Sequence, residues 1–350
     1  MRPARRHAVT WSTAAVSSSG SSSASAAPTS RPAALVASDI GSWPLVAGVE
    51  LGGTKSIAVL VRGPVIEERF EIPTIGPDET LPVLADWLLA QQARGARPVA
   101  LGIGSFGPLG LDRGAANYAT LGATPKFGWA GTDVLAPFAR LGVVATALDT
   151  DVNAAALAEA TWGAARNARV SAYLTIGTGV GVGIVSRSDD GLHRIASELG
   201  HARVRRNDDA FPGVCPFHGD CVEGLASGPA ISMRTGRAAG SFDPADPVWD
   251  DVAREIGELL SIITLAVSPD VIVVGGGVGL SSSFPRRAVV EAAERRLGGY
   301  LPGGRSVSDL VTWASFGADT GPIGAAALAY TALPSSPEPR GIMQAQVAAA

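Results

Sequence analysis

Two cysteines and two histidines in one short segment have the residue types and the spacing of a metal site. His201, Cys215, His218 and Cys221 include both cysteines and two of the four histidines of the chain. Two residues separate Cys215 from His218, and two more separate His218 from Cys221, which is the tight chelate spacing of tetrahedral zinc. Four protein ligands leave no open position, so the pattern favours a closed structural site over a catalytic one. A disulfide between Cys215 and Cys221 is the alternative, but it ignores the histidines.

Two glycine-rich turns have a backbone suited to phosphate. The first is Gly52-Gly53-Thr54-Lys55 and the second is Gly177-Thr178-Gly179-Val180-Gly181. Glycine lets several N–H groups point into one concavity, and each turn adds a threonine hydroxyl. Neither turn is a Walker loop or a Rossmann fingerprint, because each joins two strands instead of a strand and a helix. One such turn is more typical of a structural hairpin, but two of them facing a cleft predict a triphosphate clamp.

A third glycine run and two acids stand at the ends of apolar strands. The run Gly275-Gly276-Gly277 would let a flat ring lie on bare backbone. Glu50 precedes the first turn, and it either binds Mg²⁺ together with substrate phosphates or caps the N–H groups of the turn. Asp151 stands where a strand becomes a helix, which suits a general base at the ligand-binding edge of an α/β sheet. Its alternative role is a helix N-cap, but the paired turns favour the base.

The elements that must position these residues follow a mixed α/β pattern. The strand–turn–strand device opens both halves of the chain, which predicts an internally duplicated fold of two lobes around a cleft. The N-terminal lobe is expected at 45–150 together with the final helix at 321–332, and the C-terminal lobe at 151–320 with the zinc loop at 201–221. Strands are predicted at 46–51, 56–61, 65–72, 100–103, 143–148, 172–176, 181–185 and 271–274, and helices at 79–92, 152–162, 248–267 and 321–332.

The composition limits the class of protein. Of the 350 residues, 46% are hydrophobic and 17% are charged, a balance that can bury a core in about two domains. The net charge of −4 and the pI of about 5.6 provide no electrostatic footprint for nucleic acid. No apolar run approaches the roughly 18 residues of a membrane span. Two cysteines cannot make a disulfide scaffold, so a reducing compartment is expected.

Both ends of the chain lack a pattern that predicts folding. Residues 1–44 are rich in Ser, Ala, Pro and Arg, and Asp39 is their first acidic residue. Such a segment cannot bury enough surface to offset its conformational entropy, so we expect a disordered tail. Its composition is also typical of a transit peptide, and the alternative is an extension or a misplaced start codon in a high-GC bacterium. Residues 333–350 predict a second tail.

Taken together, the motifs resemble those of the ROK family of sugar kinases and repressors, and within it the zinc-containing bacterial fructokinases. The resemblance covers about residues 46–332. It rests on GVELGGTK, GIGSFGPLGL, ATPKFGWAGTDV, ALDTDVNAAALAEATWGAA, YLTIGTGVGVG, SELGH, GVCPFHGDCVEGLASGPAI and VIVVGGGV.

This resemblance implies a fold, a reaction and site residues. The fold would be actin-like (ribonuclease H-like), and a cytoplasmic homodimer would close on ATP, Mg²⁺ and a hexose. Asp151 matches the family's catalytic base, and Glu198, His201, Glu223 and Gly107 match sugar contacts. The remaining matches are the phosphate turns Gly52, Gly53, Thr54, Lys55 and Thr178, Gly179, Gly181, the adenosine-side Gly275, Gly276 and Gly277, and the zinc ligands His201, Cys215, His218 and Cys221.

Three features of the sequence depart from the family pattern, and a fourth, Thr150, points to one group of its members. Thr150 precedes the base, as in fructokinase-type members, where glucokinases usually have Asn. Ala196-Ser197 stand where fructokinases usually have His-Pro, and Val182 replaces a common glycine in the second turn. The Ser-rich N-terminal segment is not a family feature.

The expected function is ATP-dependent phosphorylation of a hexose, with D-fructose converted to fructose 6-phosphate. The alternatives are another hexose (mannose, glucose or an amino sugar), a non-catalytic sugar-binding relic, and a sugar-sensing repressor. The intact Asp151 and turns disfavour the relic. The repressor would need a helix-turn-helix domain, and residues 1–44 show no helical periodicity that would build one.

Overall fold

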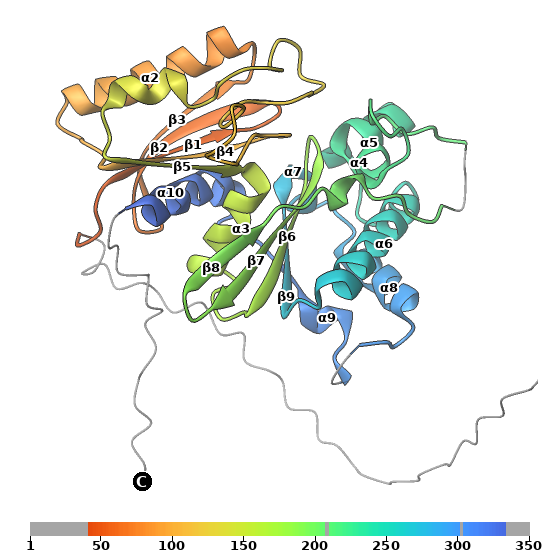
Figure 1. Cartoon of the computed structure of the whole chain (residues 1–350). Helices are drawn as coiled ribbons and strands as arrows, with labels where there is room; N and C mark the ends of the chain where they lie inside the picture. Colours follow the sequence, from red (N-terminus) through yellow and green to blue (C-terminus); the bar gives the residue numbers. More distant parts are fainter. Residues whose placement is uncertain (1–40, 207–209, 302–303, 334–350) are drawn as a thin grey trace, which may run out of the picture. The chain divides into compact units, whose positions relative to one another are not determined.

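The computed structural model describes residues 41–206, 210–301 and 304–333 (Figure 1). The tails predicted at 1–44 and 333–350 therefore lie almost entirely outside the described residues. Trp43 is an exception, because its ring packs edge-on against Trp162 and Tyr330 at centroid distances of 6.0 and 5.2 Å. This aromatic contact joins residues far apart in the sequence, which is why no local pattern could place Trp43 in the core.

The first half of the chain forms a five-stranded sheet with the order β3-β2-β1-β4-β5. Strands β1, β2 and β3 are antiparallel neighbours, and β4 and β5 continue from β1 in parallel. Strands β1 and β4 are buried almost throughout, as expected where helices cover both faces of a sheet. The bounds are β1 Val46–Leu51, β2 Lys55–Arg62, β3 Val65–Pro73, β4 Ala100–Ser105 and β5 Ala145–Thr150.

The second half repeats this arrangement strand for strand. Its five-stranded sheet has the order β10-β9-β6-β7-β8, with β6, β7 and β8 antiparallel and β9 and β10 continuing from β6 in parallel. The predicted duplication is therefore confirmed. Strands β8 and β10 were not predicted, because the first is short and polar at His193 and Arg194 and the second has only three residues. The bounds are β6 Val170–Ile176, β7 Val180–Ser188, β8 Gly191–Ile195, β9 Val271–Gly275 and β10 Val311–Trp313.

The helices cover the faces of the two sheets. The four predicted helices are present. Helices α4, α5, α7 and α9 were not predicted because they are short, and α8 because it is strongly charged. No helix of the described segments is long and apolar enough to cross a membrane. The bounds are α2 Pro77–Ala93, α3 Asp151–Thr161, α4 Val222–Ala226, α5 Gly228–Thr235, α6 Trp249–Val267, α7 Gly276–Gly279, α8 Arg286–Leu297, α9 Val307–Leu310 and α10 Thr320–Ala332, with short 3₁₀ turns that include η1 Ala136–Leu141 and η2 Leu199–His201.

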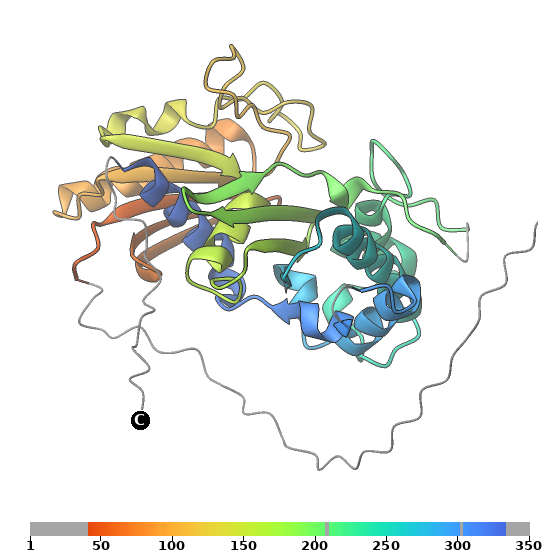
Figure 2. The same cartoon turned by 60° about the horizontal axis from the view of Figure 1, so that its bottom comes forward.

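Helices α3 and α10 exchange sheets. Helix α3 follows β5 but packs on β6 and β7, while α10 follows β10 but packs on β1 and β4 (Figures 1 and 2). The two helices also pack closely on each other, which requires small residues. A Cβ on Gly324 of α10 would collide with the backbone of Ala154 in α3, and one on Gly102 of β4 would collide with α10. The exchange places the start of α3 between the two sheets.

Candidate active site and metal centre

The carboxyl ends of the parallel strands bring most of the predicted residues together. In the first sheet, β1 runs into the turn at Gly52, β4 is followed by Gly107, and β5 by Asp151. In the second sheet, β6 runs into the turn at Gly177 and β9 into the glycine run. Because parallel strands end at the same edge of a sheet, each half contributes one ligand-binding edge.

The two glycine turns meet each other. The Oγ1 atoms of Thr54 and Thr178 lie 3.4 Å apart, and a Cβ on Gly53 would lie 3.2 Å from the Thr178 methyl group. Both threonines are exposed, so their hydroxyls are accessible to a ligand. On the second sheet, a Cβ on Gly177 would lie 3.6 Å from the N atom of Gly277, which puts the second turn beside the third glycine run. The two predicted turns and the third glycine run therefore lie next to one another.

Within the third run the glycines differ in their surroundings. Gly275 ends β9, and a side chain there would collide with the Tyr173 hydroxyl. Gly276 has a φ of +82°, which favours glycine. Nothing lies within 4 Å of a Cβ on Gly277, so this backbone faces open space. A flat ring would find room at Gly277.

Gly181 and Val182 lie in strand β7 and not in the second turn, which spans Gly177 to Gly179. A Cβ on Gly181 would lie 2.6 Å from a methyl group of Val152, so this glycine allows α3 to approach β7. Val182 is fully buried in the core of the second sheet. A β-branched residue suits that strand position, and the turn itself keeps its glycines.

Asp151 is the first residue of α3, directly after β5. Thr150 is the N-cap, and its Oγ1 accepts a hydrogen bond from the Asn153 N–H at 3.3 Å, so Asp151 is not needed as the cap. Burial raises the pKa of Asp151 to about 6. A hydrogen bond from the Val152 N–H opposes this shift, and the carboxylates of Glu198 and Glu223 add to it. The electrostatics thus link the predicted base with two predicted sugar contacts.

Glu50 belongs to the same group of acids. Burial, and then the Asp151 carboxylate, raise the pKa of Glu50 to about 8. Its carboxylate lies against Gly321 in the first turn of α10, where a side chain would collide with it. The Gly52 N–H donates to the Lys55 carbonyl at 3.1 Å, and among the described residues Glu50 accepts no hydrogen bond from this turn. The capping alternative is therefore not what the structure shows.

Lys126, and not the predicted Lys55, directs its ammonium at the first glycine turn. The Lys55 ammonium points to the β3 side of the turn, where it forms an ion pair with Glu71 at 3.2 Å. The Lys126 ammonium, from the long segment between β4 and β5, donates to the Gly53 carbonyl at 2.5 Å. Sequence reasoning assigned no role to Lys126. The signal was available, because Lys55 and Lys126 are the only lysines of the chain.

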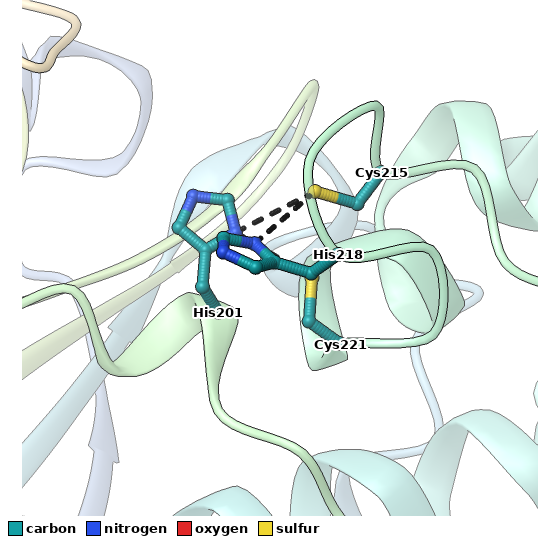
Figure 3. A group of neighbouring side chains, drawn as sticks. All are labelled: His201, Cys215, His218 and Cys221. Carbon is teal, nitrogen blue, oxygen red and sulfur yellow. Dashed lines mark hydrogen bonds between the residues drawn. The ribbon is translucent and has the colours of Figure 1, made fainter.

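The predicted metal ligands converge. Their donor atoms all lie within 4.8 Å of one another, and the four side chains point to a common centre in Figure 3. His201 Nδ1 lies 3.4 Å from Cys221 Sγ and 3.7 Å from Cys215 Sγ, and His218 Nδ1 lies 3.6 Å from Cys215 Sγ. Tetrahedral zinc bonds of about 2.0–2.3 Å separate sulfur and nitrogen ligands by about 3.6 Å, so the spacing fits zinc.

Both cysteines are buried and free, so the disulfide alternative is not what the structure shows. Burial, with the Cys215 thiol close by, raises the pKa of the Cys221 thiol well above its usual range. Two thiolates can share this pocket only if a cation compensates their charge. The donor set and its burial therefore suit a metal ion with two thiolate ligands.

Glu223 connects the metal loop to the second turn. It stands at the start of α4, directly after Cys221 and Val222. Its Oε2 accepts a hydrogen bond from the Val180 N–H at 3.1 Å, and its Oε1 lies 4.0 Å from His201 Nδ1. The loop that carries the cysteines is thus tied to the backbone directly after Gly179.

The other predicted sugar contacts lie in different settings. Glu198 is exposed and precedes the 3₁₀ turn η2, which ends at His201. Gly107 follows β4 and precedes Pro108 through a cis peptide bond. Glu198 lies close enough to Asp151 to raise its pKa, whereas no described contact joins Gly107 to the other site residues.

Comparison with known proteins agrees with this geometry. The pattern described as "ROK family" matches residues 46–332. The chain belongs to the ROK family. It is 38% identical over 297 residues to the fructokinase of Zymomonas mobilis, covering 81% of this chain and 96% of the relative. It is 36% identical over 295 residues to the fructokinase of Pediococcus pentosaceus, covering 83% and 99% of the two chains.

A solved structure shows the same fold. The ROK family glucokinase of Streptomyces griseus, in complex with glucose and AMPPNP, superposes with a TM-score of 0.63 at 25% identity, covering 82% of this chain and 99% of that one. The duplicated sheets are those of the actin-like ATPase fold. The fold and the extent predicted from the motifs are therefore confirmed.

Proposed function

We propose that this ROK protein is an ATP-dependent hexose kinase that converts D-fructose and ATP to fructose 6-phosphate and ADP. The observation that carries the proposal is the position of Asp151. This carboxylate stands at a strand end with a pKa of about 6, beside Glu198 and Glu223. Its lobe carries the second of the two glycine turns, which contact each other through Thr54 and Thr178. Relatives named fructokinase at 36–38% identity support fructose as the hexose.

Asp151 acts as the general base in this reaction. With a pKa of about 6 it is mostly a carboxylate at pH 7, yet it binds a proton far better than an exposed aspartate does. It accepts the proton of the attacking sugar hydroxyl. Because the phosphoryl transition state is loose, the remaining work is positioning and neutralisation of charge.

The glycine turns orient the nucleotide. The N–H groups of Gly53, Thr54, Thr178 and Gly179 and the two threonine hydroxyls face the phosphates, while Gly52 closes the first turn through its bond to the Lys55 carbonyl. Gly275, Gly276 and Gly277 accept the adenosine side. Glu50 would hold Mg²⁺ together with ATP, and the ion supplies charge neutralisation at the phosphates. Gly181 supports this arrangement from β7, where it lets α3 approach the strand.

The metal loop shapes the sugar side. His201, Cys215, His218 and Cys221 would hold zinc as a structural ion, which fixes the loop between Glu198 and Glu223. We assign His201 Nδ1 to the metal and leave its other ring nitrogen for the sugar. Glu198, Glu223 and Gly107 are the further proposed sugar contacts. We expect the enzyme to be a cytoplasmic homodimer, which sedimentation of the purified protein tests.

A coupled assay that measures ADP release tests the proposed function. Purified protein is supplied with MgATP and, in parallel, with fructose, mannose, glucose and N-acetylmannosamine. We expect the highest kcat/KM with fructose. A higher value with another hexose would replace the substrate but keep the reaction class, whereas no turnover with any of them would contradict the kinase itself.

A further inference from the structure

Lys126 carries a positive charge close to the first glycine turn. Among the described residues it forms no ion pair, and the bond from its ammonium to the Gly53 carbonyl is its one side-chain hydrogen bond. An ammonium group has three N–H donors, so two remain for another acceptor. Partial burial also lowers the pKa of Lys126, which means that the protein does not compensate this charge. A ligand with negative charge would supply what is missing.

The segment around Lys126 is anchored firmly enough to hold the ammonium in place. Trp129 is fully buried, its indole N–H donates to the Ile75 carbonyl at 2.7 Å, and its ring packs edge-on against Phe106 at 5.1 Å. The Trp129 N–H also donates to the Lys126 carbonyl at 3.2 Å. These contacts place Lys126 beside the first turn without using its charge.

Lys55, the lysine within the turn, has its charge engaged elsewhere. Its ammonium pairs with Glu71 at 3.2 Å, and Glu71 also pairs with Arg69 at 2.5 Å. Glu71 and Arg69 both lie on β3, whereas Lys126 contacts Gly53, the residue that abuts Thr178 of the second turn. Of the two lysines, Lys126 is therefore the one whose ammonium is directed at the meeting point of the turns.

We propose that Lys126 binds the transferred phosphoryl group of ATP and neutralises its charge in the transition state. This inference rests on the proposed kinase function. The sugar oxygen forms a bond to the γ-phosphorus, Asp151 takes the hydroxyl proton, and the bond to the β–γ bridging oxygen breaks so that ADP leaves with the electron pair. Lys126 keeps its proton throughout and donates hydrogen bonds to the γ-oxygens. Such a donor is typically worth about 10²–10³-fold in kcat.

The test compares ligands that differ only in the γ-phosphoryl group. Lys126→Met, Lys126→Arg, Lys55→Met and wild type are titrated calorimetrically with MgADP and with Mg-AMPPNP, and their kcat and KM are measured. We expect Lys126→Met to lose about 10²-fold or more in kcat and about tenfold in AMPPNP affinity, with ADP affinity within about twofold of wild type. Lys126→Arg, which keeps a cation, should retain more turnover, and Lys55→Met should lose less than Lys126→Met. Phe127→Ala is the matched control, since the Phe127 side chain is 97% exposed in the same segment and should leave every constant unchanged.

The outcomes separate this inference from the proposed function. An inactive wild type would contradict the kinase, whereas an active wild type with a Lys126→Met loss below about threefold would overturn the inference alone. Equal losses of ADP and AMPPNP affinity would also overturn it, because they would mean that Lys126 only shapes the turn through Gly53. If Lys126→Met melts at a lower temperature than wild type, the comparison with Lys126→Arg distinguishes a loss of charge from a loss of stability. The inference is supported if Lys126→Arg loses less AMPPNP affinity or less kcat than Lys126→Met does. Identical behaviour of the two variants opposes it.

Discussion

Asp151 combines two properties at the residue scale, a rigid position at the first residue of α3 and a pKa raised to about 6. Asp151→Asn should keep the melting temperature and ATP binding but lose at least about a hundredfold in kcat, because the hydroxyl proton then has no acceptor. In wild type, kcat/KM should fall as the pH drops below about 6, where the base becomes protonated. Pre-steady-state and steady-state rates between pH 5 and 8 measure both effects. Near-normal turnover of Asp151→Asn would refute the assignment.

The raised pKa of Glu50 predicts how the stability of the protein depends on pH. Its pKa of about 8 lies above that of an exposed glutamate, so the folded state holds a proton that the unfolded chain releases. The stability linked to that proton is complete below the unfolded pKa and is lost as the pH rises to about 8. Glu50→Gln, which is always neutral, should therefore gain stability relative to wild type as the pH rises from about 5 to 8. Melting curves across this range test the sign, and a constant difference would contradict it.

At the scale of elements, the bond from the Val180 N–H to Glu223 couples the metal loop to the second glycine turn. Cys215→Ser should release zinc, loosen the loop and raise the KM for the sugar, because Glu198 and Glu223 flank it. Because the Val180 N–H bond to Glu223 at 3.1 Å ties the loop to the second turn, we also expect a smaller rise in the KM for ATP. Elemental analysis and kinetics test this together, with Glu223→Gln as the variant that keeps zinc. Fully active protein without metal would end the idea.

Substitutions at Gly183 and Gly277 distinguish a packing role of glycine from a ligand-binding role. A Cβ on Gly183 of β7 would collide with the Val152 carbonyl of α3, so Gly183→Ala should destabilise the protein by about 1–3 kcal/mol. Gly277→Ala meets nothing within 4 Å and should leave the melting temperature unchanged. Its effect should be a higher KM for ATP, if the adenine ring lies on this backbone. Equal stability of the two variants would disprove the close packing of α3 on β7.

At the scale of the whole molecule, Trp43 marks where the described chain begins to pack against the core. Deleting Met1 to Ser42 should leave the melting temperature and the kinetics unchanged, because it removes no residue of the described core. Trp43→Ala should instead lower the free energy of unfolding by more than about 1 kcal/mol, since it removes the ring that packs on Trp162 and Tyr330. Calorimetry of both proteins is the measurement. A large loss of stability in the truncated protein would show that the N-terminal segment packs.

The two halves are also joined by charge. Asp149 on β5 accepts a hydrogen bond from the Arg194 guanidinium on β8 at 2.6 Å, and the Asp149 side chain is almost fully buried. The pair links β5, an edge strand of the first sheet, to β8, an edge strand of the second. No local pattern predicts this ion pair, because its two residues lie 45 positions apart in the sequence.

The amino-acid sequence by itself determined the duplicated α/β fold, the grouping of two cysteines with two histidines, the two glycine turns and the position of Asp151 at a strand end. Each of these depends on local properties: strand and helix periodicity, glycine at a turn, and ligands a few residues apart. The tertiary structure alone decided that α3 and α10 exchange sheets, that Glu50 and Asp151 share one electrostatic environment, and that Glu223 supports the second turn. It also turned Lys55 toward Glu71 and brought Lys126 to Gly53, a residue 73 positions away. Such contacts follow from how whole elements pack, and packing depends on residues too distant in the chain for any periodicity or spacing to relate them.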